Sequence, residues 1–127
     1  MAINTTAITV LLVENQTLIR QSLSEKLTTD NGLRVLAELA DGSKAEVTAM
    51  ALQPDVVVLA IGNPGEPDLR ALQGLRIVLP ETAVVALVTG EVPEQRLKAQ
   101  EYGASAVIEK SADQHTLLQA IYEVCDR

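Results

Sequence analysis

The side chains best suited to chemistry in this chain stand directly after short apolar runs. Glu14 and Asn15 follow the run at residues 7–13, and Lys110 follows the run at residues 105–109. A carboxylate, an amide and an ammonium group brought together can hold a polar ligand, or they can satisfy one another as an ion pair and a helix cap. Which of these they do depends on the elements that carry them.

Several kinds of enzyme site are disfavoured by the residues around these positions. Residues 14–17 contain no glycine, so the glycine-rich turn that holds nucleotide phosphates after a first strand is missing. The chain has no Gly-x-Ser-x-Gly motif, and its single histidine, His115, stands in a segment of helical periodicity, where we expect it on the helix surface. We therefore predict no catalytic residue, no cofactor and no enzymatic activity.

Apolar runs alternate along the chain with segments of helical periodicity. Runs rich in β-branched residues predict strands at residues 7–13, 33–39, 56–61, 83–88 and 105–109. Between them, apolar residues recur three or four positions apart, as in Leu69, Leu72 and Leu75. This alternation predicts one α/β domain, residues 1–127, built as a doubly wound (βα)₅ sandwich of the flavodoxin-like kind with a parallel sheet.

The predicted strands differ in polarity, which indicates their order in the sheet. Residues 33–39 and 105–109 mix polar with apolar positions, whereas residues 56–61 are apolar throughout. Central parallel strands are covered on both faces, so the second and fifth strands belong at the edges and the order is 2-1-3-4-5. In such a sheet a crevice opens beyond the carboxyl ends of the first and third strands, where Glu14 and Ala60 are expected.

Three features of the predicted helices bear on their contacts. The second helix carries an apolar face with Val47, Met50 and Ala51. Ser111 and Gln114 have the spacing of a capping box at the start of the last helix. The last helix also carries a wide apolar stripe, made of Leu117, Leu118, Ile121, Val124 and Cys125. Most of this stripe is expected to pack on the sheet, and the rest can face a partner.

Composition excludes several classes of partner. Ten basic residues against seventeen acidic ones give a net charge of −7, and the basic residues are scattered singly, so this segment is not predicted to bind nucleic acid. No apolar run approaches the roughly 20 residues that a membrane-spanning helix needs. The first residues carry no basic export signal, and the single cysteine, Cys125, fits a reducing compartment. We therefore expect a cytoplasmic protein.

The segments LLVEN, PDVVVLAIGNPG and GASAVIEK make a family resemblance specific. Over residues 8–125 the chain resembles the response regulator receiver domain, the CheY-like module of two-component signal transduction, in particular the receivers of NarL/LuxR-type transcription regulators. In that family, two acidic residues after the first strand bind Mg²⁺ and an aspartate at the end of the third strand accepts a phosphoryl group. A Ser or Thr ends the fourth strand, and a Lys ends the fifth.

Carried onto this chain, the resemblance implies a degenerate phospho-acceptor pocket. Glu14 and Asn15 stand for the acidic pair, Ala60 stands for the acceptor, and Lys110 matches the family lysine. A methyl group has no lone pair with which to attack a phosphoryl donor, and one carboxylate offers Mg²⁺ too little charge. We predict neither phosphorylation nor a bound metal. Glu14 is expected to pair with Lys110, and Asn15 to cap the first helix rather than hold a ligand.

The resemblance also concerns the residues that relay activation in the family. By the family's spacing the hydroxyl position falls on Val88, or on Thr89 if the spacing is shifted by one residue. The aromatic residue that moves inward on activation corresponds to Val107. The switch that links the pocket to the last helices is therefore expected to be lost.

Two functions follow as expectations. The first is an atypical receiver, independent of phosphorylation, that regulates through a protein partner or as a homodimer. It would form the N-terminal half of a LuxR-type transcription regulator, with a DNA-binding domain beyond Arg127. The alternative is a sensor module that binds a small neutral or apolar molecule between Ala60, Val88 and Val107.

Overall fold

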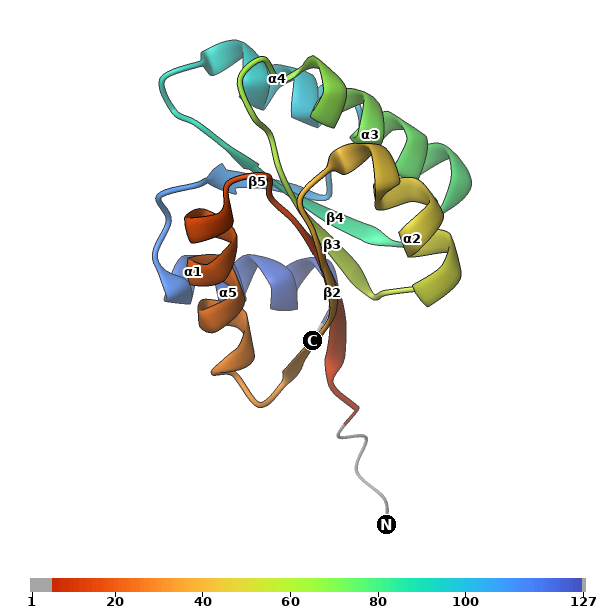
Figure 1. Cartoon of the computed structure of the whole chain (residues 1–127), viewed down its shortest axis with the longest axis vertical. Helices are drawn as coiled ribbons and strands as arrows, with labels where there is room; N and C mark the ends of the chain where they lie inside the picture. Colours follow the sequence, from red (N-terminus) through yellow and green to blue (C-terminus); the bar gives the residue numbers. More distant parts are fainter. Residues whose placement is uncertain (1–5, 127) are drawn as a thin grey trace.

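A computed structural model describes residues 6–126 of the chain. Figure 1 shows a central sheet with helices on both sides. The elements in chain order are β1 (Ile8–Val13), α1 (Thr17–Thr28), β2 (Leu33–Leu39), a 3₁₀ turn η1 (Gly42–Lys44), α2 (Ala45–Leu52), β3 (Val56–Ala60), α3 (Glu66–Val78), β4 (Ala83–Val88), α4 (Pro93–Glu101), β5 (Ala106–Glu109) and α5 (Gln114–Val124). The predicted strands begin and end within one residue of the observed ones.

All neighbouring strands of the sheet are parallel, and their order is β2-β1-β3-β4-β5. The predicted fold class and strand order are therefore confirmed. Every residue of β3 is buried, whereas β2 and β5 are partly exposed, as expected of a central strand and two edge strands. Because the strands are parallel, their carboxyl ends all lie at one edge of the sheet, and the loops that follow them meet there.

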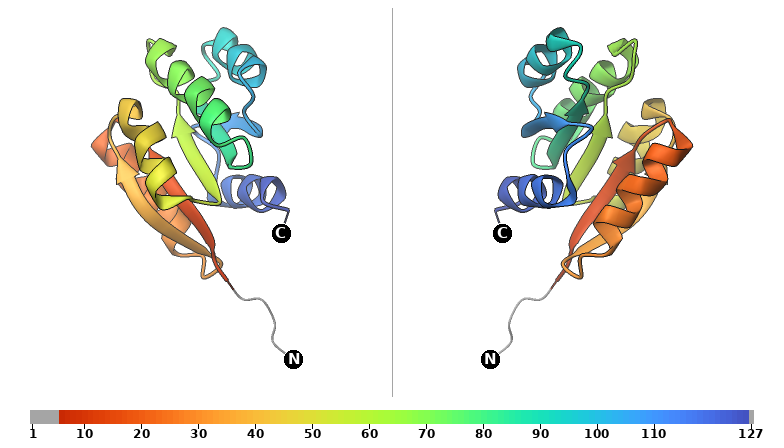
Figure 2. Two further views of the ribbon diagram at one scale, coloured as in Figure 1. Left: turned by 90° about the vertical axis from the view of Figure 1, so that its right-hand side faces the viewer. Right: turned by 90° about the vertical axis from the view of Figure 1, so that its left-hand side faces the viewer.

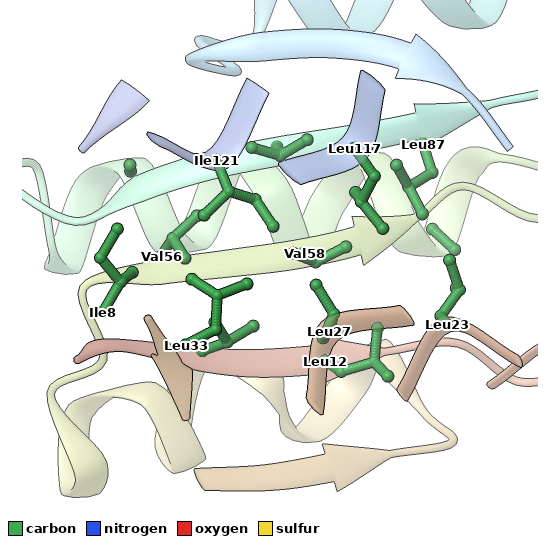
Figure 3. Packing of buried hydrophobic residues seen from close by; sticks show 14 residues of the cluster. Ile8, Leu12, Leu23, Leu27, Leu33, Val56, Val58, Leu87, Leu117 and Ile121 are labelled. Carbon is green, nitrogen blue, oxygen red and sulfur yellow. The ribbon is translucent and has the colours of Figure 1, made fainter. Parts of the chain in front are cut away.

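The helices form two layers, with α1 and α5 on one face of the sheet and α2, α3 and α4 on the other (Figures 1 and 2). Side chains along each strand alternate between these layers. In β3, Val58 and Ala60 join the cluster beneath α1 and α5, whereas Val57 and Leu59 join the cluster beneath the other three helices. Figure 3 shows the first of these clusters, in which leucines of α1 and residues of α5 close over the strands.

The apolar face predicted for α2 lies on the opposite side from the one that packs. Val47 and Met50 are 66% and 50% exposed, while Ala45 and Ala49 are fully buried. The helix is apolar around most of its circumference, and its alanines allow a close approach to α3 and the sheet that larger side chains would prevent. The small size of the alanine side chains therefore determines which face of α2 is buried. The periodicity of apolar residues had favoured the face with the larger Val47 and Met50.

Helix α5 begins differently from the prediction. Asp113 is its N-cap, and the Asp113 carboxylate accepts a hydrogen bond of 2.8 Å from the Thr116 N–H, so the predicted capping box of Ser111 and Gln114 is wrong. His115 is exposed, as expected.

The apolar stripe of α5 mostly faces inward, as predicted. Leu117 and Ile121 are buried in the cluster beneath α1 and α5, and the other three members, Leu118, Val124 and Cys125, are partly buried against it. Core packing thus accounts for most of this stripe.

A matched pair of isoleucines tests this account of the core. Ile121→Ala is expected to lower the free energy of unfolding by about 2–5 kcal/mol, because it opens a cavity in a packed cluster. Ile77→Ala removes the same atoms from a side chain that is 74% exposed, and is expected to change stability by less than about 0.5 kcal/mol. Urea unfolding followed by circular dichroism measures both. Similar losses in the two variants would contradict the packing described.

Candidate functional site

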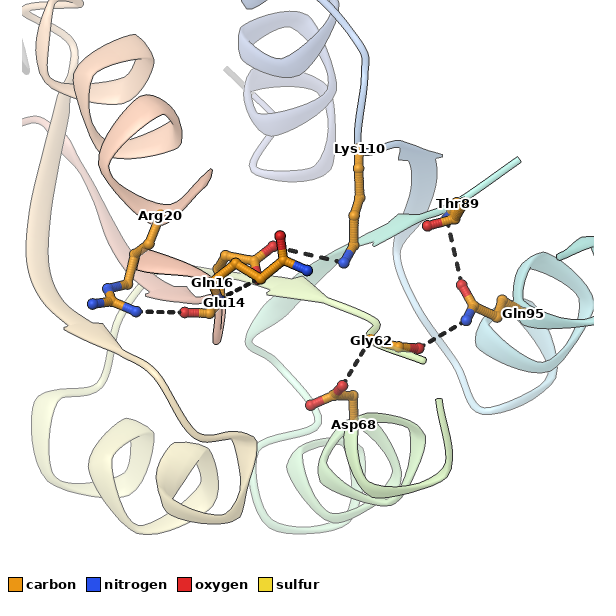
Figure 4. Close-up of polar contacts among 8 residues, drawn as sticks. All are labelled: Glu14, Gln16, Arg20, Gly62, Asp68, Thr89, Gln95 and Lys110. Carbon is orange, nitrogen blue, oxygen red and sulfur yellow. Dashed lines mark hydrogen bonds and ion pairs between the residues drawn. The ribbon is translucent and has the colours of Figure 1, made fainter. Parts of the chain in front are cut away.

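The crevice at the carboxyl ends of the strands is organised around Glu14, which directly follows β1 (Figure 4). Its side chain is buried, with 1% of the residue exposed. Carboxylate oxygen Oε2 accepts a hydrogen bond of 2.9 Å from the Gln16 N–H. The backbone is held as well, since the Glu14 N–H donates to the Leu39 carbonyl and Arg20 Nη1 donates to the Glu14 carbonyl, both at 2.9 Å. One carboxylate oxygen and the backbone of Glu14 are therefore held by hydrogen bonds.

The remaining carboxylate oxygen faces Lys110, which directly follows β5. Lys110 Nζ lies 3.6 Å from Glu14 Oε1, an ion pair that confirms the predicted pairing of these two residues. Oε1 is buried and accepts no hydrogen bond, so the ammonium charge is what compensates it. The lysine side chain is itself 18% exposed and reaches in from the rim of the crevice.

Asn15 does not play the role predicted for it. It is exposed, and the N-cap of α1 is Gln16, whose side chain makes no capping hydrogen bond. The Gln16 N–H is satisfied instead by the Glu14 carboxylate. The acidic side chain thus takes over the local hydrogen bonding that the amide was expected to provide.

Ala60, the last residue of β3, is 5% exposed and pairs in register with Leu87 of β4. Both side chains pack in the cluster beneath α1 and α5. Val88 and Val107 pack in the other cluster, across the sheet from Ala60. The structure therefore does not bring together the three residues between which a small molecule was expected to bind. A ligand beside the Ala60 side chain would be separated from the other two by the backbone of the sheet.

Thr89 follows β4 at the same edge of the sheet. It is half-buried, and with Val88 and Lys110 it lines a cavity of about 260 Å³ at the ends of β4 and β5. By the alternation of side chains along an extended chain, Thr89 faces the layer of Ala60 and Leu87, while Val88 faces the opposite layer. Its N–H points toward Gln95 Oε1 at a long hydrogen-bond distance of 3.4 Å.

Two further polar side chains at the crevice come from helices and were missed by sequence reasoning. Asp68, in the first turn of α3, accepts a hydrogen bond of 2.8 Å from the Gly62 N–H. Gln95 of α4 is 5% exposed, and its amide nitrogen Nε2 donates to the Gly62 carbonyl at 2.8 Å. An acidic residue in a first turn is the usual complement to the helix dipole, so the sequence gave no signal that Asp68 also reaches the crevice.

Burial raises the pKa of the Asp68 carboxyl above its ordinary value of 3.8. The Gly62 N–H and the positive charge of Lys110 act in the opposite direction, and the negative charges of Glu14 and Asp41 add to the increase. The crevice therefore holds two carboxylates, Glu14 and Asp68, and one ammonium group.

Other kinds of site find little support in the part of the chain that the structure describes. Among residues 6–126, no group of three or more His, Cys, Asp or Glu side chains is placed to hold a metal ion. Within the same residues, every helix is too short or too polar to cross a membrane.

Comparison with known proteins gives a consistent result. The family model described as the response regulator receiver domain matches residues 10–122. A two-component response regulator of the LuxR family from Aurantimonas sp. SI85-9A1 superimposes with a TM-score of 0.86 at 26% identity, covering 95% of this chain and 86% of that one. The likeness thus extends over nearly the whole chain.

Curated relatives are longer than this chain. The nitrate/nitrite response regulator protein homolog of Haemophilus influenzae is 24% identical over 115 residues, which make up 91% of this chain and 55% of that protein. The protein-glutamate methylesterase/protein-glutamine glutaminase 2 of Oleidesulfovibrio alaskensis is 30% identical over 122 residues, or 94% of this chain and 34% of that protein. The chain therefore spans about half of the first relative and a third of the second.

The ion pair can be tested with a double-mutant cycle. Lys110→Met leaves the Glu14 carboxylate buried without a counter-charge, and is expected to lower the free energy of unfolding at pH 7 by about 3 kcal/mol. In a Glu14→Gln background the same change is expected to cost less than about 1 kcal/mol, since no buried charge remains. Urea unfolding of the four proteins gives the coupling energy. Equal costs of Lys110→Met in both backgrounds would show that the two groups do not interact.

The raised pKa of Asp68 predicts a pH-dependent effect of Asp68→Asn. The folded chain binds this proton more tightly than the unfolded chain, so the contribution of Asp68 to stability is fully present below pH 3.8 and is lost as the pH rises through the folded-state pKa. An asparagine oxygen still accepts from the Gly62 N–H but carries no charge to bury. The variant is expected to be more stable than wild type at neutral pH, with a gain that disappears in acid. Unfolding measured across this range tests it, and a difference independent of pH would refute the assignment.

Proposed function

This chain belongs to the response regulator receiver domain family, and we propose that within it the chain is an atypical receiver that regulates by protein contact and is not phosphorylated. Family membership places it in two-component signalling, and the likeness to nitrate/nitrite and LuxR-family regulators favours a receiver of the NarL/LuxR type. The loss of phosphorylation is an inference from the residues at the crevice.

The observation that carries the proposal is the side chain at the end of β3. Ala60 occupies the position of the family's phospho-acceptor, and its methyl group cannot form an acyl phosphate. The carboxylates of the crevice do not replace it, because Glu14 is paired with Lys110 and Asp68 is bonded to the Gly62 N–H from the first turn of α3. Phosphotransfer therefore has no nucleophile at this place.

The residues present do not fit the Mg²⁺ ion that the family binds. Mg²⁺ prefers several oxygen ligands with negative charge among them. Here Ala60 offers none, and Asn15 is exposed. The free oxygen of Glu14 faces the ammonium group of Lys110 at 3.6 Å. A metal would have to displace that charge, so we assign no metal to the crevice.

The family's hydroxyl position is better assigned to Thr89 than to Val88. Thr89 faces the layer of Ala60 by the alternation along the chain, whereas Val88 packs in the opposite cluster. On this assignment the hydroxyl is retained and the acceptor is lost. The position of the switch aromatic is Val107, which has no ring to move between the core and the surface. On this assignment the family's activation switch lacks the acceptor at position 60 and the aromatic ring at position 107.

Regulation by contact requires a surface for a partner. Leu18 of α1 and Leu97 of α4 are 79% and 60% exposed, and each offers an apolar side chain at the surface. We propose a protein partner or a second copy of this chain as the occupant. Residues 1–127 would form a single receiver domain, and a DNA-binding domain beyond Arg127 would make the whole protein a LuxR-type transcription regulator.

An enzymatic role is not part of the proposal, although one relative is a methylesterase. The match with that enzyme covers only a part of its length. In this chain the single histidine, His115, is exposed on α5, which leaves no serine or cysteine with a histidine base at the crevice.

The proposal predicts that the chain does not take up a phosphoryl group. Incubated with acetyl phosphate and Mg²⁺, wild type is expected to keep its mass in intact-protein mass spectrometry, and beryllofluoride is expected to leave its amide NMR spectrum unchanged. The Asn15→Asp/Ala60→Asp variant restores both missing carboxylates and is the matched comparison. Labelling of the variant alone would assign the loss to these two positions. Phosphoryl mass on wild type would overturn the proposal.

A further inference from the structure

Helix α4 buries little apolar surface against the sheet. Its buried residues are Gln95 and Ala99, so a single small apolar side chain fixes it to the sheet. Helix α3, by contrast, buries Leu69, Leu72 and Leu75. Burial of one alanine contributes far less than burial of three leucines. The position of α4 must therefore depend on polar contacts more than that of its neighbour does.

The buried polar contact is Gln95, which joins two loops of the crevice (Figure 4). Its Nε2 donates to the carbonyl of Gly62 in the β3–α3 loop, residues 61–65, at 2.8 Å. Its Oε1 lies 3.4 Å from the N–H of Thr89, which begins the β4–α4 loop, residues 89–92. One side chain from α4 thus contacts the loops that follow β3 and β4.

The other backbone group of Gly62 is held as well. The Gly62 N–H donates to Asp68 of α3, so both the N–H and the carbonyl of this residue are bonded to side chains of flanking helices. Gly65 leaves room for the same arrangement, since a Cβ there would lie 3.4 Å from Gln95 Nε2 and 3.0 Å from a methyl of Ile61. The β3–α3 loop is therefore fixed by protein groups at the place where a receiver of this family carries its phosphoryl group.

The next residue of α4 adds a second connection. Arg96 Nη1 donates to the Val107 carbonyl at 3.0 Å, and Nη2 lies 3.2 Å from Glu109 Oε2. These groups are 41% exposed, so the ion pair itself adds little stability. The contact with the carbonyl still ties α4 to β5.

From these contacts we propose that Gln95 clamps the two crevice loops to α4 and holds that helix in one position without phosphate or metal. The inference rests on the proposed function, and it supplies the means by which a receiver without phosphorylation presents one fixed surface. Helix α4 carries the exposed Leu97 beside a cavity of about 390 Å³. While Gln95 holds both loops, α4 presents this surface in one conformation.

Amide hydrogen exchange of the full chain, followed by NMR, tests the clamp. Gln95→Ala and Gln95→Met both remove the two polar contacts, and Met retains most of the buried volume. Each is expected to speed exchange in residues 61–65 and 89–92 by about tenfold relative to the amides of β1 and β3, as the loss of roughly one hydrogen bond predicts. Gln100→Ala, an exposed glutamine on the same helix, is the matched control and is expected to change neither loop.

If Gln95→Ala speeds amide exchange across the whole chain, the result for Gln95→Met decides the test. Loop exchange in Gln95→Met that stays within about twofold of wild type, after the same normalisation, would overturn the clamp, because it lies below the effect of one hydrogen bond. The measurement contains no phosphoryl donor and no metal. The two tests are therefore independent. Phosphorylation of wild type would refute the proposed function without changing the exchange rates measured here. Unchanged loop exchange in Gln95→Met would refute the clamp without bearing on whether the chain is phosphorylated.

Discussion

A carboxylate taken out of water has to be compensated by another charge or by hydrogen bonds, and in this protein that requirement falls on Glu14. The residue ends the strand next to the centre of the sheet, where the chain is covered on both faces. One of its oxygens is satisfied by the backbone of the turn into α1, and the other by the ammonium group of Lys110. The first and fifth strands of the sheet are thereby joined across the crevice by charge.

Internal pairing of polar groups extends to the neighbouring β3–α3 loop. Gly62, two residues beyond the end of β3, has its N–H bonded to Asp68 and its carbonyl bonded to Gln95. Side chains of α3 and α4 thus occupy hydrogen-bonding positions around the strand ends that an outside ligand would otherwise compete for. The parallel sheet makes this possible, because it delivers all the strand ends to one edge and all the following helices to within reach of them. Fold and internal pairing together yield a receiver in which Glu14, Asp68 and Gln95 of the crevice are already paired with other groups of the chain.

Much of this could be predicted from the sequence. The strands, their order and the Glu14–Lys110 pair followed from apolar runs and from the position of charged residues after them. The errors arose where sequence spacing does not determine direction. Small alanines, rather than Val47 and Met50, form the packed face of α2, because the gap between helix and sheet is narrow. Asp68 and Gln95 were missed because a polar residue on a helix has the same pattern whether it faces solvent or a loop. The choice between Val88 and Thr89 for the family's hydroxyl position stays open from the sequence, because a one-residue shift reverses the face to which a strand side chain points.

The Glu14–Lys110 pair also affects which substitutions position 60 can accept. Every alanine codon becomes a codon for aspartate or glutamate by one base change, so an acidic residue at position 60 is always one mutation away. That mutation would add a carboxylate to a place where the nearby lysine is already paired with Glu14 and where the carboxyl group of Asp68 lies close by. Like charges in a partly buried site oppose one another, so a carboxylate at position 60 would be disfavoured there. With Glu14 and Lys110 already paired, the crevice is poorly suited to an added carboxylate, which constrains any variant that carries an acidic residue at position 60.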